Sequence, residues 1–94
     1  MFEWDPAKAE ANLRKHGVSF DEAATVFLDP EALDGSDERH SRAELRFRRL
    51  GTSVDRRVLM VAYTVRRTAN AEAIRLISAR RASRRERAAY RAKD

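Results

Sequence analysis

The sequence predicts one small α+β domain, in which an antiparallel sheet carries two helices from the N-terminal half of the chain and one from its C-terminal end. Three observations support this fold class. The 94 residues can form a single modest core but not two. Two stretches with helical periodicity come early, and three stretches typical of strands follow them. We therefore expect residues 1–94 to form a single domain with the order β-α-α-β-β-β-α.

The first two elements have clear boundaries. Residues 2–4 (FEW) are a short strand candidate. Asp5 can accept hydrogen bonds from the first free N–H groups of a helix, and Pro6 fits the first helical position. The next residues are rich in helix formers, and Gly17 can adopt the left-handed conformation that ends a helix. The sequence thus predicts a helix that ends at Gly17.

A second helix should follow at once. Ser19 and Glu22 have the spacing of a capping box, and Asp29-Pro30 marks the end of the element. Its apolar residues follow the helical period, so we expect it to pack on the sheet. Residues 31–41 are polar and include one glycine, which indicates a connector without a core element.

Three strands and a last helix complete the fold. Residues 43–51 alternate between apolar and charged side chains, as a half-buried strand does. Residues 57–65 are apolar on both faces, which is typical of a central strand, and residues 72–80 form the next strand. Ser83 and Glu86 again have capping-box spacing and begin the final helix. We assign four aromatic side chains to the core: Trp4, Phe20, Phe27 and Phe47.

Composition excludes several classes of protein. The chain has no cysteine and only two histidines, so disulfides, thiolate metal sites and a structural zinc site are not expected. No apolar run approaches the length of a membrane span, and the N-terminus lacks the order of a signal peptide. These features predict a cytoplasmic protein that uses no metal and no cofactor and does not bind a membrane.

Charge is divided unevenly along the chain. Residues 1–38 hold three basic and ten acidic side chains, a balance of −7, and the other 17 basic and five acidic residues give +12. Most of these basic residues are arginines, whose planar fork binds phosphate with two parallel hydrogen bonds and stacks on bases. Such a basic half points to nucleic acid or another acidic partner. Charge that only maintains solubility is the alternative, and composition alone does not separate the two.

Several motifs together resemble one family. They are FEWDPAK, NLRKHGVSF-DEAATVF-DP, DERH, E-RF-LG, V-Y and IRLISAR-AS-RER-Y. In this order, and over nearly the whole chain, they resemble the BrnT toxins of bacterial type II toxin–antitoxin systems. Two stretches depart from the family's pattern. Arg48-Arg49 stands where many relatives carry apolar residues, and the turn at residues 66–73 is longer than usual.

The resemblance implies a small RelE-like fold and a ribonuclease activity that blocks protein synthesis and arrests growth. It also implies a BrnA-type antitoxin with a ribbon-helix-helix DNA-binding domain as partner. Operator DNA would be bound only through that complex. A non-catalytic nucleic-acid-binding module and a structural adaptor for an acidic partner remain alternatives with the same basic half.

A ribonuclease without metal would use the 2′-hydroxyl of the RNA as nucleophile. It needs a base, an acid for the leaving oxygen, and donors for the charge that grows on the phosphate. The resemblance makes Arg75 and Arg80 the first candidates for stabilising this charge. Residues five apart, however, point to opposite faces of a regular strand. The alternative for Arg75 is a solvent-facing position on the strand. The alternative for Arg80 is a hydrogen bond to the free carbonyls of a neighbouring turn. Arg46, on the polar face of its strand, is a further candidate.

The acid and base candidates are less distinct. His16 could serve as either, or it could only interact with the negative end of its helix. His40 lies in the charged connector, where a solvated position is expected unless the loop folds over the cleft. Tyr90 could reach the cleft from the last helix and donate a proton. Tyr63 could stack on a base, although a central strand favours the core. We expect six residues to contact RNA: Lys15, Arg48, Tyr63, Arg81, Arg84 and Arg87.

Overall fold

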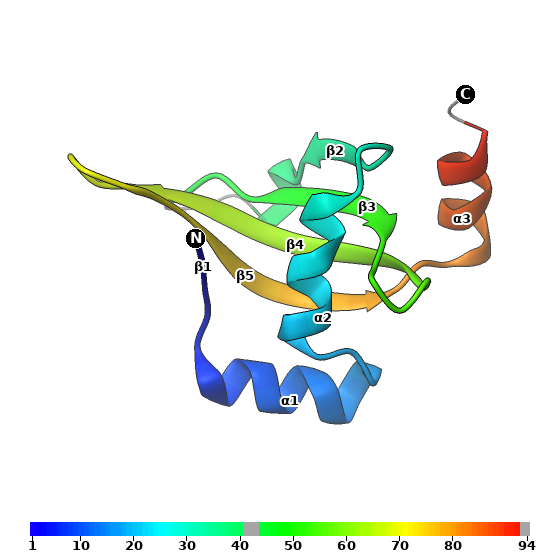
Figure 1. Cartoon of the computed structure of the whole chain (residues 1–94), viewed down its shortest axis with the longest axis horizontal. Helices are drawn as coiled ribbons and strands as arrows, with labels where there is room; N and C mark the ends of the chain where they lie inside the picture. The colour runs from blue at the N-terminus through cyan, green and yellow to red at the C-terminus, as the bar shows by residue number, and fades with distance from the viewer. Residues whose placement is uncertain (41–43, 93–94) are drawn as a thin grey trace.

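The computed structural model describes residues 1–40 and 44–92. These residues form a five-stranded sheet, three α-helices and two short 3₁₀ helices (Figure 1). The elements in chain order are β1 (Phe2–Glu3), α1 (Pro6–His16), α2 (Phe20–Thr25), η1 (Val26–Leu28), β2 (Leu33–Ser36), η2 (Glu38–His40), β3 (Phe47–Thr52), β4 (Val58–Arg67), β5 (Glu72–Arg81) and α3 (Arg84–Arg91). The α+β class predicted from the sequence is confirmed.

The sheet is mixed rather than purely antiparallel, which corrects the prediction. Its strand order is β1-β5-β4-β3-β2, and β1 pairs with β5 in parallel while every other pair is antiparallel. The first strand of the chain therefore lies beside the last one, with Phe2 opposite Ile74. This long-range pairing has no signature in the local sequence pattern.

The connector expected at residues 31–41 contains a strand, which is a second correction. β2 lies at the edge of the sheet and pairs with β3, with Leu33 opposite Leu50 and Ser36 opposite Phe47. Each of its four residues is exposed, so no apolar alternation marks the strand in the sequence.

Helices α1 and α2 cover one face of the sheet, and the core lies between these helices and the sheet (Figure 1). Asp5 accepts a hydrogen bond from the N–H of Ala7 at 2.8 Å, and Gly17 ends α1 with a φ of 69°. Both termini therefore form as the sequence predicts. The second helix is shorter than expected, because at Val26 the chain tightens into η1 before Asp29. The fully buried side chains on this covered face include Val18, Phe20, Val26, Leu59, Val61 and Leu76.

The opposite face of the sheet, here called the open face, carries Arg48, Met60, Ala62, Ser78 and Arg80. These residues alternate with the core residues of β3, β4 and β5 and are paired across the strands. A β-bulge interrupts the β4–β5 register between Ala62 and Tyr63, so that Ile77 is an extra residue in β5. Between these side chains the open face is hollowed into a pocket.

The bulge also changes the direction of Arg75. It brings Arg75 opposite Thr64 and Arg80 opposite Met60, so both arginines lie on the open face although they are five residues apart. A regular strand would have placed them on opposite faces.

Helix α3 stands at the end of β5, outside the two layers (Figure 1). Ser83 begins it with the predicted capping box, and no residue of the helix is buried. Polar contacts hold the helix in place. Among them are two hydrogen bonds of the Tyr90 hydroxyl, which donates to Asp29 at 2.5 Å and accepts from Thr52 at 3.0 Å. No helix in the described part of the chain is long and apolar enough to cross a membrane.

Candidate active site

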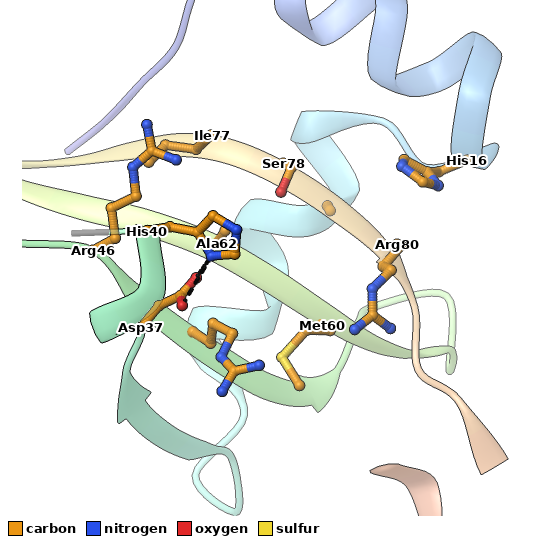
Figure 2. A pocket seen from close by; sticks show the side chains of 11 residues that line it. His16, Asp37, His40, Arg46, Met60, Ala62, Ile77, Ser78 and Arg80 are labelled. Atoms are coloured by element: carbon orange, nitrogen blue, oxygen red, sulfur yellow. Dashed lines mark hydrogen bonds and ion pairs between the residues drawn. The ribbon is translucent and has the colours of Figure 1, made fainter. Parts of the chain in front are cut away.

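A pocket of about 350 Å³ lies on the open face (Figure 2). Its floor is the middle of the sheet, where Met60, Ala62 and Ser78 present small or flexible side chains. Its walls carry the charged and titratable groups, which are His16, Asp37, His40, Arg46, Arg48 and Arg80. The chain therefore gathers two imidazoles, three guanidinium groups and one carboxylate around a cavity that can receive a polyanion.

Asp37 and His40 form a hydrogen-bonded pair at this pocket (Figure 2). The imidazole Nδ1 lies 3.1 and 3.0 Å from the two carboxylate oxygens of Asp37. Because a carboxylate only accepts hydrogen bonds, Nδ1 must carry the proton, and Nε2 of a neutral His40 is then free to accept one. The hydrogen bond from His40 lowers the pKa of Asp37, which keeps the carboxylate ionised.

The backbone holds this pair against the sheet. Asp37 follows β2 directly, and its N–H donates to the carbonyl of Arg46 at 2.8 Å. The short η2 helix then places His40 one turn after Asp37, with its N–H bonded to the Asp37 carbonyl at 3.2 Å. Asp37 is buried while the imidazole of His40 remains 64% exposed. The carboxylate is thus fixed and the ring is accessible to a substrate.

His16 reaches the same pocket from the end of α1 and lies across it from the Asp37–His40 pair (Figure 2). Asn12, one turn earlier, fixes the helix against β5. Its amide donates to the carbonyls of Val18 at 3.0 Å and Ala79 at 2.8 Å, and its oxygen accepts from the N–H of Ala79 at 3.1 Å. These contacts set the position of the last turn of α1 and so of His16.

Arg80 is held by a carboxylate of the last helix. Its Nη1 and Nη2 donate to the two carboxylate oxygens of Glu86 at 2.7 and 2.9 Å. The hydrogen bonds from Arg80 are the largest cause that lowers the pKa of Glu86 to about 2, and Glu86 in turn raises the pKa of Arg80. Arg46 lies beside η2 and Arg48 lies on β3, and together they complete the basic wall of the pocket.

The structure brings four of the predicted site residues together at this pocket: His16, Arg46, Arg48 and Arg80. Arg75 is separated from them along β5. Its Nη1 donates to Glu3 at 2.9 Å, and Glu3 also lies 3.7 Å from Arg66. Tyr90 does not line the pocket; its hydroxyl is held by Asp29 and by Thr52 at the end of β3.

Tyr63, which we expected to contact RNA, lies in the core. Its ring packs edge-on against Phe27 and stacks on Phe47, with centroid distances of 5.0 and 5.6 Å. The hydroxyl donates to Asp34 at 2.8 Å. Tyr63 is only 8% exposed, so a base could stack on its ring only if the neighbouring side chains moved.

The remaining predicted RNA contacts do not line the pocket. Lys15, Arg81 and Arg84 are exposed. Arg87 is half-buried and donates from Nη1 to the carbonyl of Ala82 at 2.7 Å. Arg81 is paired with Leu59 and so belongs to the covered face of the sheet. These four cations add to the positive potential of the protein surface but do not line the pocket.

The sequence predicts a solvated His40 unless its loop folds over the cleft, and it does not single out Asp37. A signal for the pair was present in the DERH motif, because residues three apart meet on one side of a helical turn. The signal was weak, since the surrounding segment is polar throughout and no helical period marks η2.

Among the residues that the structure describes, no group of three or more His, Cys, Asp or Glu side chains is placed to hold a metal ion.

The chain is similar to known proteins in sequence and in fold. Residues 4–86 match the family described as the ribonuclease toxin BrnT of type II toxin–antitoxin systems. The fold is similar to the 1.1 Å crystal structure of the Brucella abortus ribonuclease toxin BrnT, at a TM-score of 0.64 and 24% sequence identity. That similarity covers 89% of this chain and 99% of the Brucella chain. No curated protein gives a match to the chain.

Proposed function

Because the chain belongs to the BrnT family of ribonuclease toxins of type II toxin–antitoxin systems, we propose that the open-face pocket is its ribonuclease site. One observation carries this proposal. The Asp37–His40 pair faces a cavity whose walls hold three arginines and a second histidine. Such a set can move protons and stabilise a phosphate without a metal ion or another cofactor.

The reaction we propose is attack of the RNA 2′-hydroxyl on the adjacent phosphorus. Nε2 of His40 takes the 2′-hydroxyl proton while Asp37 stabilises the imidazolium that forms. The new 2′-oxygen–phosphorus bond replaces the bond to the 5′-oxygen. Protonated His16, on the opposite side of the pocket, donates its proton to that leaving oxygen. The products are a 2′,3′-cyclic phosphate and a free 5′-hydroxyl.

The arginines stabilise the charge that grows on the phosphate during this step. A guanidinium can bond two phosphoryl oxygens at once, and Arg46, Arg48 and Arg80 approach the pocket from different sides. Because Glu86 holds Arg80 before substrate arrives, little reorganisation of that guanidinium is needed as the charge develops. The exposed cations outside the pocket attract RNA rather than contact the reacting phosphate.

Cleavage of RNA would stop translation and arrest growth, and a partner must silence it. We propose that the partner is a BrnA-type antitoxin with a ribbon-helix-helix domain, and that operator DNA is bound only through the complex. A basic pocket is covered most readily by an acidic segment, because opposite charges complement each other across an interface. The toxin would act in the cytoplasm, where its RNA substrate is found.

The test uses purified protein and a defined single-stranded RNA, with the product ends mapped. We expect cyclic phosphate ends in the presence of a chelator. His40→Ala should lower kcat by about 10²–10⁴-fold, the usual contribution of a positioned acid or base. Arg14→Ala is the control, because Arg14 only pairs with Glu10 on the exposed side of α1. Cleavage by His40→Ala at the control's rate, or products with 3′-phosphate monoesters from the outset, would contradict the proposal.

A further inference from the structure

We propose that Glu86, which lies in α3 outside the pocket, is a positioning residue that holds Arg80 in the orientation needed to bind the reacting phosphate. This inference rests on the proposed ribonuclease site. It extends that site to a helix none of whose residues lines the cavity, so α3 would be required for catalysis as well as for the fold.

The geometry of the pair leaves one edge of Arg80 available. Glu86 bonds the guanidinium end-on, because each of its oxygens accepts from a different Nη at 2.7 and 2.9 Å. Nη1 also donates to the carbonyl of Arg81 at 3.3 Å. The Nε–H and the remaining Nη2 N–H lie along the other edge, which presents two parallel donors to a phosphate. The ion pair therefore orients Arg80 without consuming its binding capacity.

Glu86 is itself held in place. The N–H of Ser83 donates to Oε1 of Glu86 at 2.8 Å, and the N–H of Glu86 donates to the Ser83 hydroxyl at 3.1 Å. This capping box fixes the carboxylate at the start of α3, where the helix dipole also favours a negative charge. With its pKa near 2, Glu86 is ionised at every pH at which the enzyme would work.

An unrestrained arginine would not be equivalent. Arg80 stands near the end of β5 and 42% of its side chain is exposed, so without Glu86 it could adopt many rotamers. A misplacement of about 1 Å in a charge-stabilising group can cost on the order of 100-fold in rate. Glu86 thus keeps a mobile side chain in place before the substrate arrives.

The experiment compares Glu86→Gln with wild type in single-stranded RNA cleavage. Glutamine still serves the capping box, but it offers only one acceptor oxygen to the guanidinium. We expect kcat to fall roughly 10- to 100-fold with little change in KM. Glu72→Gln is the matched control, because Glu72 forms an ion pair with Arg67 at 2.9 Å away from the pocket. It should keep the wild-type kcat.

A double variant separates positioning from a structural role. If Glu86 acts through Arg80, then Glu86→Gln should have no further effect on kcat in an Arg80→Ala background. Ser83→Ala, which weakens the cap but leaves the Arg80–Glu86 pair, should lower the Tm and keep kcat.

Two results would overturn the inference: an unchanged kcat in Glu86→Gln, or equal losses with and without Arg80. Full turnover by Arg80→Ala alone would instead contradict the proposed site itself.

Discussion

Arg48 and Arg49 are neighbours on β3, yet they belong to opposite faces of the sheet and to different tasks. Arg48 is exposed and lines the pocket of the open face. Arg49 points into the covered side, where its Nη1 donates to Asp34 at 2.7 Å and its guanidinium lies 4.9 Å from the centroid of Phe27. Its other N–H groups donate to the carbonyls of Val26 and Asp29 at 3.3 Å.

The difference shows that arginine content alone does not measure an RNA-binding surface. Four contacts bind Arg49 to β2 and η1, so its charge is satisfied within the fold and only 18% of its side chain is exposed. The same is true of Arg57, which bonds Glu22 and the carbonyl of Gly17. The partners that the fold supplies decide which arginines remain available to a polyanion.

The largest expected effect is on the free energy of unfolding, and it compares two adjacent residues of β4 that belong to opposite faces of the sheet. Leu59 is fully buried on the covered side, whereas Met60 lines the floor of the pocket. Leu59→Ala should lower the free energy of unfolding by about 3–5 kcal/mol, because it removes buried apolar surface and leaves a cavity. Met60→Ala should cost roughly 1 kcal/mol or less, since its side chain already borders open space. Urea unfolding at neutral pH measures both. Equal losses would mean that the open face is packed like the covered one.

The sequence predicted the elements whose signals are local. Asp5 and Ser19 cap their helices as expected because a cap depends on only a few neighbouring residues. The alternation of residues 43–51 likewise identified β3. The parallel pairing of β1 and the edge strand β2 were missed, since the first depends on distant residues and the second carries no apolar pattern.

The candidate site was predictable only in part for the same reason. His16, Arg46 and Arg80 were selected from residue type and resemblance, and the structure places all three at one pocket. The bulge at Ile77, which sets the faces of β5, cannot be read from the alternation of a regular strand. His40 reaches the pocket through a polar loop, so its contribution depends on a tertiary contact that no short motif specifies.

A smaller effect should distinguish Arg48 from Arg49 directly. Arg49→Ala should reduce the free energy of unfolding by about 1–3 kcal/mol, because Asp34 and two carbonyls lose a donor. Arg48→Ala should change stability by no more than about 0.5 kcal/mol. For RNA binding, the order of the two effects should be reversed. Arg48→Ala should weaken binding and make its salt dependence shallower by about one phosphate contact, and Arg49→Ala should not.

Both quantities can be measured on the same samples, by chemical denaturation and by a titration of RNA over a salt series. Arg84→Ala is a useful third variant, because Arg84 is exposed at the start of α3 and should affect only the salt dependence. A stability loss in Arg48→Ala equal to that of Arg49→Ala would remove the proposed division between the two faces.

The smallest effect concerns Tyr63, whose place on the covered face can be tested by its titration. Burial, followed by the hydrogen bond to Asp34, raises the pKa of Tyr63 to about 12 from its ordinary value of 10. A group whose folded pKa is raised contributes stability that is fully present below pH 10 and is lost as the pH rises through 12. The chain has two tyrosines, so Tyr90→Phe leaves Tyr63 as the single phenol to observe. In that variant, the tyrosinate absorbance should appear near pH 12 and together with unfolding.

Tyr63→Phe should cost about 1 kcal/mol at neutral pH, the usual contribution of one hydrogen bond, and should flatten the alkaline fall in Tm. A midpoint near pH 10 in the folded Tyr90→Phe protein would show that the Tyr63 hydroxyl is exposed to solvent, and would return Tyr63 to the residues that could contact RNA.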